Sequence, residues 1–307
     1  MSEGGSHLPG PLVSTFSIVA LDLRNGDLGV AVQSKYFSVG PVVPWAEAGV
    51  GAIATQAWAN VSYGPEGLKL LRRGLSAEEV VKELTGKDPE RDRRQLGVVD
   101  ARGGVAVYTG RKCIPWAGSR TGQGYTVQGN ILTGPEVIEA MAEAFEKARG
   151  ELAERLVETL WEGEEAGGDA RGRQSAALLV VREGAGPGGY GDRYIELRVE
   201  DHVTPIRELK RLLDMKYAYI LMGRSRRKAE EGRLEEALSL AEEAVARSPG
   251  LDSVYLNLGG IYYRLGDRAS ALEAYREAIR INPMARGYLK HVIAQSLGLE
   301  EEFLRRL

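Results

Sequence analysis

The 307-residue sequence contains very little cysteine and histidine, two residue types on which much enzyme chemistry depends. Cys113 is the only cysteine, which excludes an internal disulfide and a multi-cysteine metal site. The three histidines are His7, His202 and His291, so none lies in the long stretch between the first two. Chemistry in that stretch must work without imidazole, which disfavours a Ser-His-Asp triad and most zinc sites. We therefore expect neither a metal nor a cofactor.

An excess of one charge is also lacking, because 40 Lys and Arg residues face 43 Asp and Glu residues, a net charge of −3. A general polyanion binder carries a clear basic excess, so DNA and RNA are poor candidates. No apolar run approaches the roughly 20 residues that cross a bilayer. The start of the chain lacks the basic and apolar regions of a signal peptide. We expect a cytoplasmic protein that binds neither nucleic acid nor membrane.

The remaining composition changes along the chain and predicts distinct segments. Residues 1–14 are rich in Gly, Ser and Pro and are expected to form a disordered leader. In residues 15–204, strand patterns alternate with pairs of amphipathic helices. The strands are expected at residues 15–21, 28–34, 49–55, 95–100, 104–109, 125–132, 175–182 and 192–199. Helices in pairs argue against a doubly wound parallel sheet and favour an α+β fold, an αββα four-layer sandwich of two antiparallel sheets between helical layers.

Residues 205–307 are helical in pattern and contain a repeat. Five positions recur at an offset of 34 residues, which is the tetratricopeptide period: Gly232, Ala237, Leu238, Ala244 and Pro249 return as Gly266, Ala271, Leu272, Ala278 and Pro283. Two repeats, at about residues 218–251 and 252–285, need capping helices because about three are required for stability. Stacked helix pairs suit a protein partner, such as a peptide or a helix. Packing on the first domain, or formation of a homo-oligomer, is the alternative use of this surface.

Several separated motifs in the first domain occur in a characteristic order: Thr15–Ala20, Gly29–Lys35, Gly49–Gln56, Tyr63–Pro65, Gln128–Asn130 and Gly167–Leu178. Together they resemble the bacterial and archaeal family called domain of unknown function 1028, over about residues 15–199. That family is grouped with the N-terminal nucleophile hydrolases, whose fold is the αββα sandwich. The resemblance therefore implies the same architecture as the pattern of strands and helices.

The resemblance also implies a chemistry that needs no histidine. In this superfamily a Thr, Ser or Cys becomes the first residue of the mature chain and attacks an amide carbonyl. Its own α-amine, with an unperturbed pKa of about 8, accepts the proton. Thr15 is the candidate nucleophile because it begins the first strand, and this role requires removal of residues 1–14. The alternatives are that Thr15 is only a strand residue, or that Ser17 on the same face attacks instead.

Similarity to proteasome-type sites implies roles for further residues of the first domain. Gln33 stands where an Asp orients the nucleophile, and Lys35 is the candidate for the positive charge that a lysine supplies there. Asp169 resembles the Asp that braces the amino terminus. Asn130 is the candidate amide donor to an oxyanion, and Gln56 and Asn60 are further amide candidates for substrate binding.

The glycine-rich loop after residue 165 gathers polar side chains at the start of an apolar strand. The candidates for substrate binding there are Arg171, Arg173, Gln174 and Ser175. An arginine holds a substrate carboxylate through two parallel hydrogen bonds. The alternative is an internal brace between Asp169 and an arginine that shapes the loop.

These inferences lead to one main hypothesis and two rivals. The main hypothesis is an amidohydrolase that acts on a small amide or peptide through Thr15. The first rival is a non-catalytic adaptor that uses the sandwich and the repeats for binding. The second is catalysis by the uncut chain through the loop from Asp169 to Ser175.

Overall fold

The computed structural model describes residues 12–13 and 15–307 of the chain. The chain divides into two compact units between Lys210 and Arg211. We call them the sandwich unit and the repeat unit. The division falls inside one long helix, α5 (Pro205–Glu230), a few residues beyond the expected boundary at position 204.

The sandwich unit contains two antiparallel sheets. Sheet A has the order β1-β5-β6-β7, with β4 also beside β5, and consists of β1 (Leu12–Val13), β4 (Pro44–Glu47), β5 (Gly51–Trp58), β6 (Arg94–Asp100) and β7 (Val105–Thr109). Sheet B has the order β11-β10-β3-β2-β9-β8 and consists of β2 (Thr15–Leu21), β3 (Leu28–Ser34), β8 (Gly118–Gly122), β9 (Tyr125–Gly129), β10 (Ser175–Val181) and β11 (Arg193–Val199).

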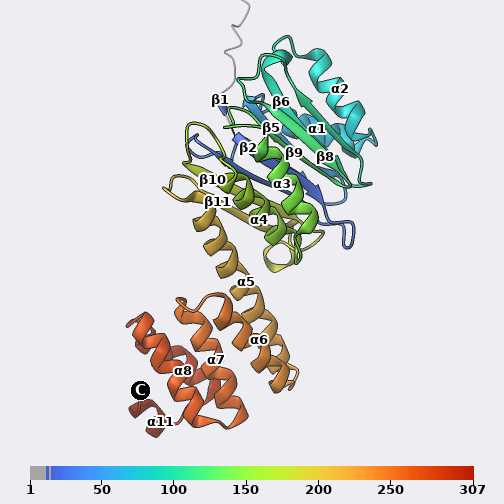
Figure 1. The fold of residues 1–307 in the computed structure, drawn as a ribbon. Coiled ribbons are helices and arrows are strands. Elements are labelled where there is room, and N and C mark those ends of the chain that lie inside the picture. Colours follow the sequence, from blue (N-terminus) through green and yellow to red (C-terminus); the bar gives the residue numbers. More distant parts are fainter. Residues whose placement is uncertain (1–11, 14) are drawn as a thin grey trace, which may run out of the picture. The chain divides into compact units, whose positions relative to one another are not determined.

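A pair of helices covers the outer face of each sheet (Figure 1). Sheet A is covered by α1 (Tyr63–Arg72) and α2 (Ala77–Lys87), and sheet B by α3 (Glu136–Lys147) and α4 (Leu152–Glu165). Short 3₁₀ turns, η1 (Arg91–Arg93) and η2 (Pro187–Gly189), lie in the connections. The mixed α/β domain with antiparallel sheets confirms the coarse fold prediction.

The apolar residues of the central strands are buried on both faces. Val19 and Val32 of sheet B belong to one apolar cluster with Ala54 and Val99 of sheet A, which forms the core between the sheets. Ile53, by contrast, lies in a second cluster under α1 and α2. Because β2, β3 and β6 are covered on both sides, they are buried along their whole length.

The end of the leader forms part of sheet A. Leu12 pairs with Trp58 and Val13 pairs with Ala57, and the Val13 side chain is fully buried. This differs from the expectation of a disordered leader over residues 1–14. Two consecutive apolar residues meet an open strand edge and an apolar core there. The strand pairing and the burial of apolar surface offset the conformational entropy that the two residues lose when they become ordered. Residues 1–11 and 14 lie outside the part of the chain that the structure describes.

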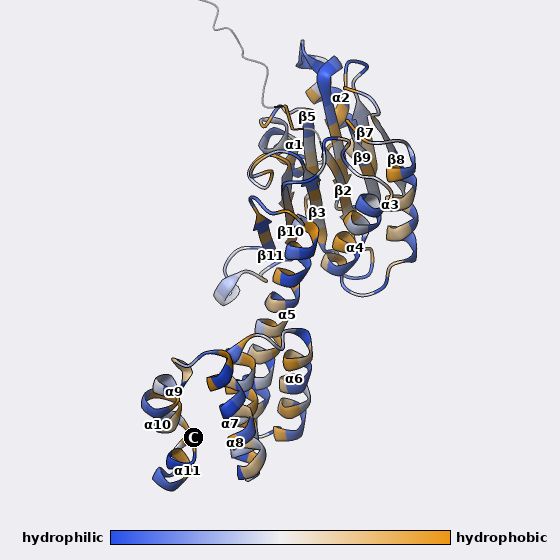
Figure 2. Cartoon of the chain, turned by 60° about the vertical axis from the view of Figure 1, so that its left-hand side comes forward, coloured by the Kyte–Doolittle hydropathy of each residue, from blue (hydrophilic) through white to orange (hydrophobic). Residues whose placement is uncertain are grey.

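The repeat unit is entirely helical, as predicted for tetratricopeptide repeats. After α5 it contains α6 (Leu234–Arg247), α7 (Asp252–Leu265), α8 (Arg268–Ile281), α9 (Ala285–Tyr288), the π-helical η3 (Leu289–Ile293), α10 (Ala294–Leu297) and α11 (Glu301–Arg305). Hydrophobic and hydrophilic segments alternate along α6 and its neighbours (Figure 2). The recurring Ala237 and Ala271 have no exposed surface, which lets paired helices approach closely. In the described part of the chain, no helix is both long and apolar enough to span a membrane.

Candidate functional site

Thr15 begins β2 and has no exposed surface in the chain that carries its leader. Its Oγ1 donates a hydrogen bond to the carbonyl oxygen of Gln33. Its own carbonyl accepts the N–H of Asn130 at 3.0 Å. Across the sheet Thr15 pairs with Ser34, and Ser34 pairs with Ser175. Three hydroxyl residues therefore form a row over β2, β3 and β10 at one end of sheet B.

Gln33 contacts Thr15 through its backbone and not through its side chain. Val32 faces the core between the sheets, whereas a Cβ at Gly29 would lie 2.7 Å from Leu156 of α4. Side chains alternate along a strand, so the Gln33 side chain lies on the helix-covered face with Gly29. The Thr15 side chain lies on the other face. The contact expected of the Gln33 side chain is thus made by its carbonyl oxygen, which accepts the Thr15 hydroxyl.

Asp169 ties the glycine-rich loop to the end of β3. Its Oδ2 accepts the N–H of Lys35 at 3.3 Å, and its backbone forms a β-bridge with Leu132. The same carboxylate accepts Nε and Nη2 of Arg171 at 3.0 and 2.7 Å. Asp169 is only 4% exposed, so these bonds fix the loop firmly. The structure thus contains the internal Asp–Arg brace that was the alternative to a substrate contact.

The other polar residues of the loop also have internal partners. Arg173 Nη1 donates to Glu164 Oε1 at 2.7 Å, and Gln174 Nε2 donates to Asp201 Oδ1 at 3.0 Å. The exposed Lys35 reaches the carbonyl of Arg173 with its Nζ at 3.4 Å. Arg173 remains nearly half exposed, so it keeps donors on the surface. Internal contacts therefore fix the shape of the loop, and both of its arginines remain partly exposed to solvent.

Ser175 is the last of the loop candidates, and its hydroxyl forms hydrogen bonds with backbone groups. Its Oγ donates to the carbonyl of Tyr36 at 2.5 Å and accepts the N–H of Val39 at 3.2 Å. It has no exposed surface. Ser175 therefore fixes the segment after β3 beside the start of β10.

A buried network of amides connects the two sheets next to Thr15. Ser17 Oγ donates to Gln56 Oε1 at 2.7 Å and accepts from Gln128 Nε2 at 2.6 Å. Gln95 Oε1 accepts from Gln56 Nε2 at 2.8 Å and from Asn130 Nδ2 at 2.9 Å. All five side chains are at most 1% exposed. The Ser17 hydroxyl therefore has a partner both as donor and as acceptor. The Gln56 side chain likewise hydrogen-bonds to other side chains of the network through both its oxygen and its nitrogen.

Sequence reasoning missed Gln95, the residue that links Asn130 to this network. Gln95 lies directly opposite Gln56 in the pairing of β5 with β6. The available signal was a glutamine at the start of a run of apolar strand residues. A strand buried on both faces accepts such a side chain only where partners satisfy it.

Asn60 and Cys113 have structural surroundings. Asn60 Oδ1 accepts the N–H and the hydroxyl of Ser62 at the turn before α1. Its Nδ2 lies 3.4 Å from Asp88, a carboxylate whose pKa would rise through burial but is lowered by hydrogen bonds, chiefly from Arg94. Cys113 is buried, and burial raises the pKa of its thiol to about 11. A thiol of this kind is not a thiolate nucleophile at neutral pH.

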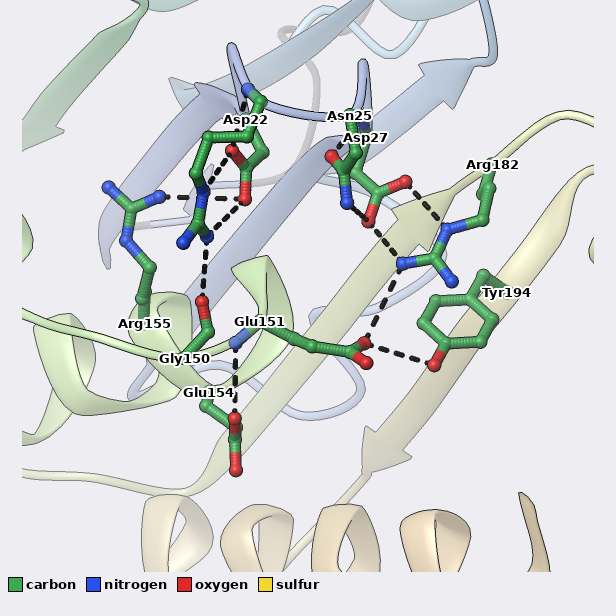
Figure 3. A network of polar contacts seen from close by, with 10 residues as sticks. Asp22, Asn25, Asp27, Gly150, Glu151, Glu154, Arg155, Arg182 and Tyr194 are labelled. Carbon is green, nitrogen blue, oxygen red and sulfur yellow. Dashed lines mark hydrogen bonds and ion pairs between the residues drawn. The ribbon is translucent and has the colours of Figure 1, made fainter. Parts of the chain in front are cut away.

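A second polar network lies at the opposite end of sheet B (Figure 3). Asp27 accepts Nε and Nη2 of Arg182 at 2.8 and 2.6 Å, and the Arg182 guanidinium lies 3.9 Å from the centre of the Tyr194 ring. Asp22 accepts Nε of Arg24 at 2.9 Å, and this hydrogen bonding lowers the pKa of Asp22. These contacts hold the β2–β3 hairpin and β10 together, so we assign the network to stability. Within the described residues, no group of three or more His, Cys, Asp and Glu side chains is arranged to hold a metal ion.

Comparison with known proteins finds a matching family model for each of the two units. The model of a family described as "Family of unknown function (DUF1028)" matches residues 15–209, and a tetratricopeptide repeat model matches residues 228–295. Among solved structures, the chain is similar to protein SPO2555 from Silicibacter pomeroyi, described with the family model DUF1028. The two are 33% identical with a TM-score of 0.60, over 65% of this chain and 84% of that chain. No curated protein matches this chain.

Proposed function

Because the chain belongs to the DUF1028 family, whose model matches its residues 15–209, we propose that the sandwich unit is an N-terminal nucleophile amidohydrolase. The observation that carries the proposal is the position of Thr15. It is the first residue of the central strand β2, and its hydroxyl is bound at the end of the sheet where Asn130 and the Asp169 loop converge. Under this proposal, the two sheets between helical layers form the αββα sandwich of the N-terminal nucleophile hydrolases.

The reaction requires a free amine on Thr15. In the chain with its leader this nitrogen is an amide and cannot accept a proton. After a cut between Ser14 and Thr15, the amine has an ordinary pKa of about 8 and is a base near neutral pH. The hydroxyl then attacks the substrate amide carbonyl, and its proton passes to the amine and on to the leaving nitrogen. Water releases the acyl group from Thr15 by the same route in reverse.

Asn130 is the proposed donor to the oxyanion. Its side-chain amide has two N–H bonds, and one of them donates to Gln95 at 2.9 Å. The second N–H is left for a developing negative charge close to Thr15. A buried, preorganised donor of this kind stabilises a transition state strongly, because it needs no reorganisation during the reaction.

The Asp169 loop is the proposed wall of the substrate site. Asp169 holds its shape, and Arg173 is the more exposed of the two arginines, with 46% of its side chain exposed against 33% for Arg171. Asp169 binds Arg171 through two side-chain donors, whereas Glu164 binds Arg173 through one, so we assign the recognition of a substrate carboxylate to Arg173 first. The proposed substrates are accordingly small amides or peptides that carry an acidic group.

A binding role is the second candidate, and a specific observation favours it. In the chain with its leader, Thr15 is fully buried, and the side chains of Ser175 and Arg171 have internal partners. Tetratricopeptide repeats commonly mediate protein–protein interactions. In this alternative the repeat unit binds a protein and the sandwich unit remains uncut.

The deciding experiment combines intact mass with turnover. The mass of the purified protein is measured, and a panel of small amides and N-acylated amino acids is tested with wild type, Thr15→Ala and Thr121→Ala. Thr121 is an exposed strand threonine and serves as the matched control. The hydrolase proposal expects a chain that begins at Thr15, and a loss of at least about 100-fold in kcat/KM for Thr15→Ala alone.

Two results would contradict the proposal. An uncut chain that turns over no amide supports the binding role. An uncut chain whose turnover is unchanged in Thr15→Ala places the reaction in the loop from Asp169 to Ser175.

A further inference from the structure

One edge of β5 is shared between two partners that follow each other along the strand. Strand β4 pairs with Gly51–Ala54, and the leader strand β1 pairs with Ala57 and Trp58. The other edge of β5 is paired with β6 from Gly51 to Ala57. Among the residues that the structure describes, β1 is therefore the only strand along the last part of this edge, close to the start of β2.

The leader fills an apolar site as well as a strand position. Val13 has no exposed surface and belongs to the cluster between the sheets together with Val39, Val43 and Ala59. Leu12, one residue earlier, is only half-buried. One leader side chain thus inserts into the core of the sandwich while its neighbour stays partly at the surface.

The backbone is strained at this point of the edge. Ala57, directly opposite Val13, has a φ of 67°. Ile131, directly after Asn130, has a φ of 52°. Left-handed conformations are unfavourable for residues with a side chain and concentrate at functional sites. The two strained residues lie on the segments next to Thr15, one on β5 and one after β9.

From these observations we propose that, after removal of the leader, the edge of β5 at Ala57–Trp58 binds the acyl side of an extended peptide substrate as an added strand. The substrate would take the register of Leu12 and Val13 in the intact chain. The inference rests on the proposed function of Thr15. It narrows the substrate class from small amides in general to peptides in extended conformation.

The register also predicts a side-chain preference. The bond to be cut in the chain follows Ser14, and Val13 stands one residue before it. The residue preceding the acyl residue of a substrate therefore enters the site now filled by Val13. Main-chain bonds to a strand edge supply affinity, and the pocket for the alternate side chain supplies specificity. We expect valine or isoleucine there, and rejection of aspartate.

The test uses a readout that needs no turnover. The full-length chain with Val13→Asp, in a Thr15→Ala background, is compared with the Thr15→Ala chain by hydrogen exchange of the segment Gly51–Trp58. The buried carboxylate cannot stay in an apolar site, so exchange of this segment should rise about tenfold or more. Adding the peptide acetyl-Gly-Pro-Leu-Val-Ser-amide, which copies the leader, should restore protection. The same peptide with Asp in place of Val should not.

Two further variants control the test. Leu12→Asp, at the half-buried neighbour, should raise exchange much less than Val13→Asp. Val13→Ala provides a milder opening of the site if the aspartate variant does not fold. Unchanged exchange in the Val13 variants, or no protection by the valine peptide, would overturn the inference.

The failure of this inference is distinguishable from failure of the hydrolase proposal. If wild type hydrolyses amides through Thr15 but the valine peptide gives no protection of β5, the substrate mode is wrong and the function stands. If the peptide protects β5 but no form that begins at Thr15 hydrolyses any amide, the binding edge stands and the hydrolase proposal fails.

Discussion

Among single residues, Gln95 has the largest set of hydrogen-bond partners in the inter-sheet network. Its Oε1 accepts from Gln56 and Asn130, and its Nε2 donates to the carbonyl of Gly129 at 2.8 Å and to Thr109 Oγ1 at 3.0 Å. Buried donors and acceptors of this kind stabilise little when paired but cost much when one partner is removed. Gln95 therefore contributes to the stability of the sandwich unit and also fixes the orientation of the Asn130 side-chain amide.

Replacing Gln95 by leucine should lower the free energy of unfolding of the sandwich unit by about 2–4 kcal/mol, because two buried donors lose their acceptor. Denaturant unfolding measures this loss. Gln174→Ala removes one hydrogen bond of a half-exposed side chain and should cost at most about 1 kcal/mol. Equal effects of the two substitutions would show that the network rearranges without cost.

Asp22 gives a prediction about pH. Hydrogen bonds from Arg24 lower the pKa of Asp22 below its ordinary value of 3.8, so the folded state favours the charged form. The resulting stability is present above the unfolded pKa and is lost as pH falls through the folded pKa. Asp22→Asn should therefore lower the melting temperature at pH 7, and the difference from wild type should shrink below about pH 4. A difference that stays constant from pH 7 to pH 3 would contradict this explanation.

At the scale of elements, glycines decide how closely helices approach their partners. A Cβ on Gly64, in the first turn of α1, would lie 2.2 Å from the Trp45 ring of β4. Gly86, near the end of α2, has no atom within 4 Å of the same position. The two glycines are in neighbouring helices but differ in packing.

The pair therefore makes a matched prediction. Gly64→Ala should destabilise the protein by about 1–3 kcal/mol, because a rigid ring must move. Gly86→Ala should stabilise it by about 0.5–1 kcal/mol, because alanine has the higher helix propensity and meets no atom. Thermal or urea unfolding of both variants measures the difference in sign. A stabilising Gly64→Ala would mean that α1 shifts freely on sheet A.

The elements with a clear pattern were predictable from the sequence, and those without one were not. The strands at 15–21 and 28–34 agree with β2 and β3 to the residue, because β-branched residues and the Asn25–Gly26 turn mark them. Strand β8, with the sequence Gly-Ser-Arg-Thr-Gly, was missed because it lies at a sheet edge and needs no apolar residues. Strand β1 was missed because two apolar residues carry no periodicity.

The candidate site was predictable only in part, for a related reason. The pairing of Ser34 with both Thr15 and Ser175 places the glycine-rich loop near the start of β2, and separate motifs already suggested that they belong together. The sequence does not show which face of a strand a polar residue takes. The backbone contact of Gln33 and the partners of Gln95 therefore required the three-dimensional structure.

At the scale of the whole molecule, each unit has apolar clusters of its own. Val32 and Ala54 belong to the core between the sheets of the sandwich unit, and Tyr263, Tyr275 and Phe303 belong to a cluster of the repeat unit. The chain passes from one unit to the other within α5. Separate cores are the physical basis for separate cooperative unfolding, even where the chain between them is a continuous helix.

We therefore expect two transitions in the calorimetric unfolding of the full chain. Gly259→Ala is the matching substitution in the repeat unit. A Cβ on Gly259 of α7 would lie 2.6 Å from the Tyr275 ring, just as one on Gly64 would meet the Trp45 ring. Gly64→Ala should lower one transition temperature and Gly259→Ala the other, each by several degrees for a cost of about 1–3 kcal/mol. A single transition lowered by both substitutions would mean that the units unfold together. In that case the two cores do not suffice to make the units independent.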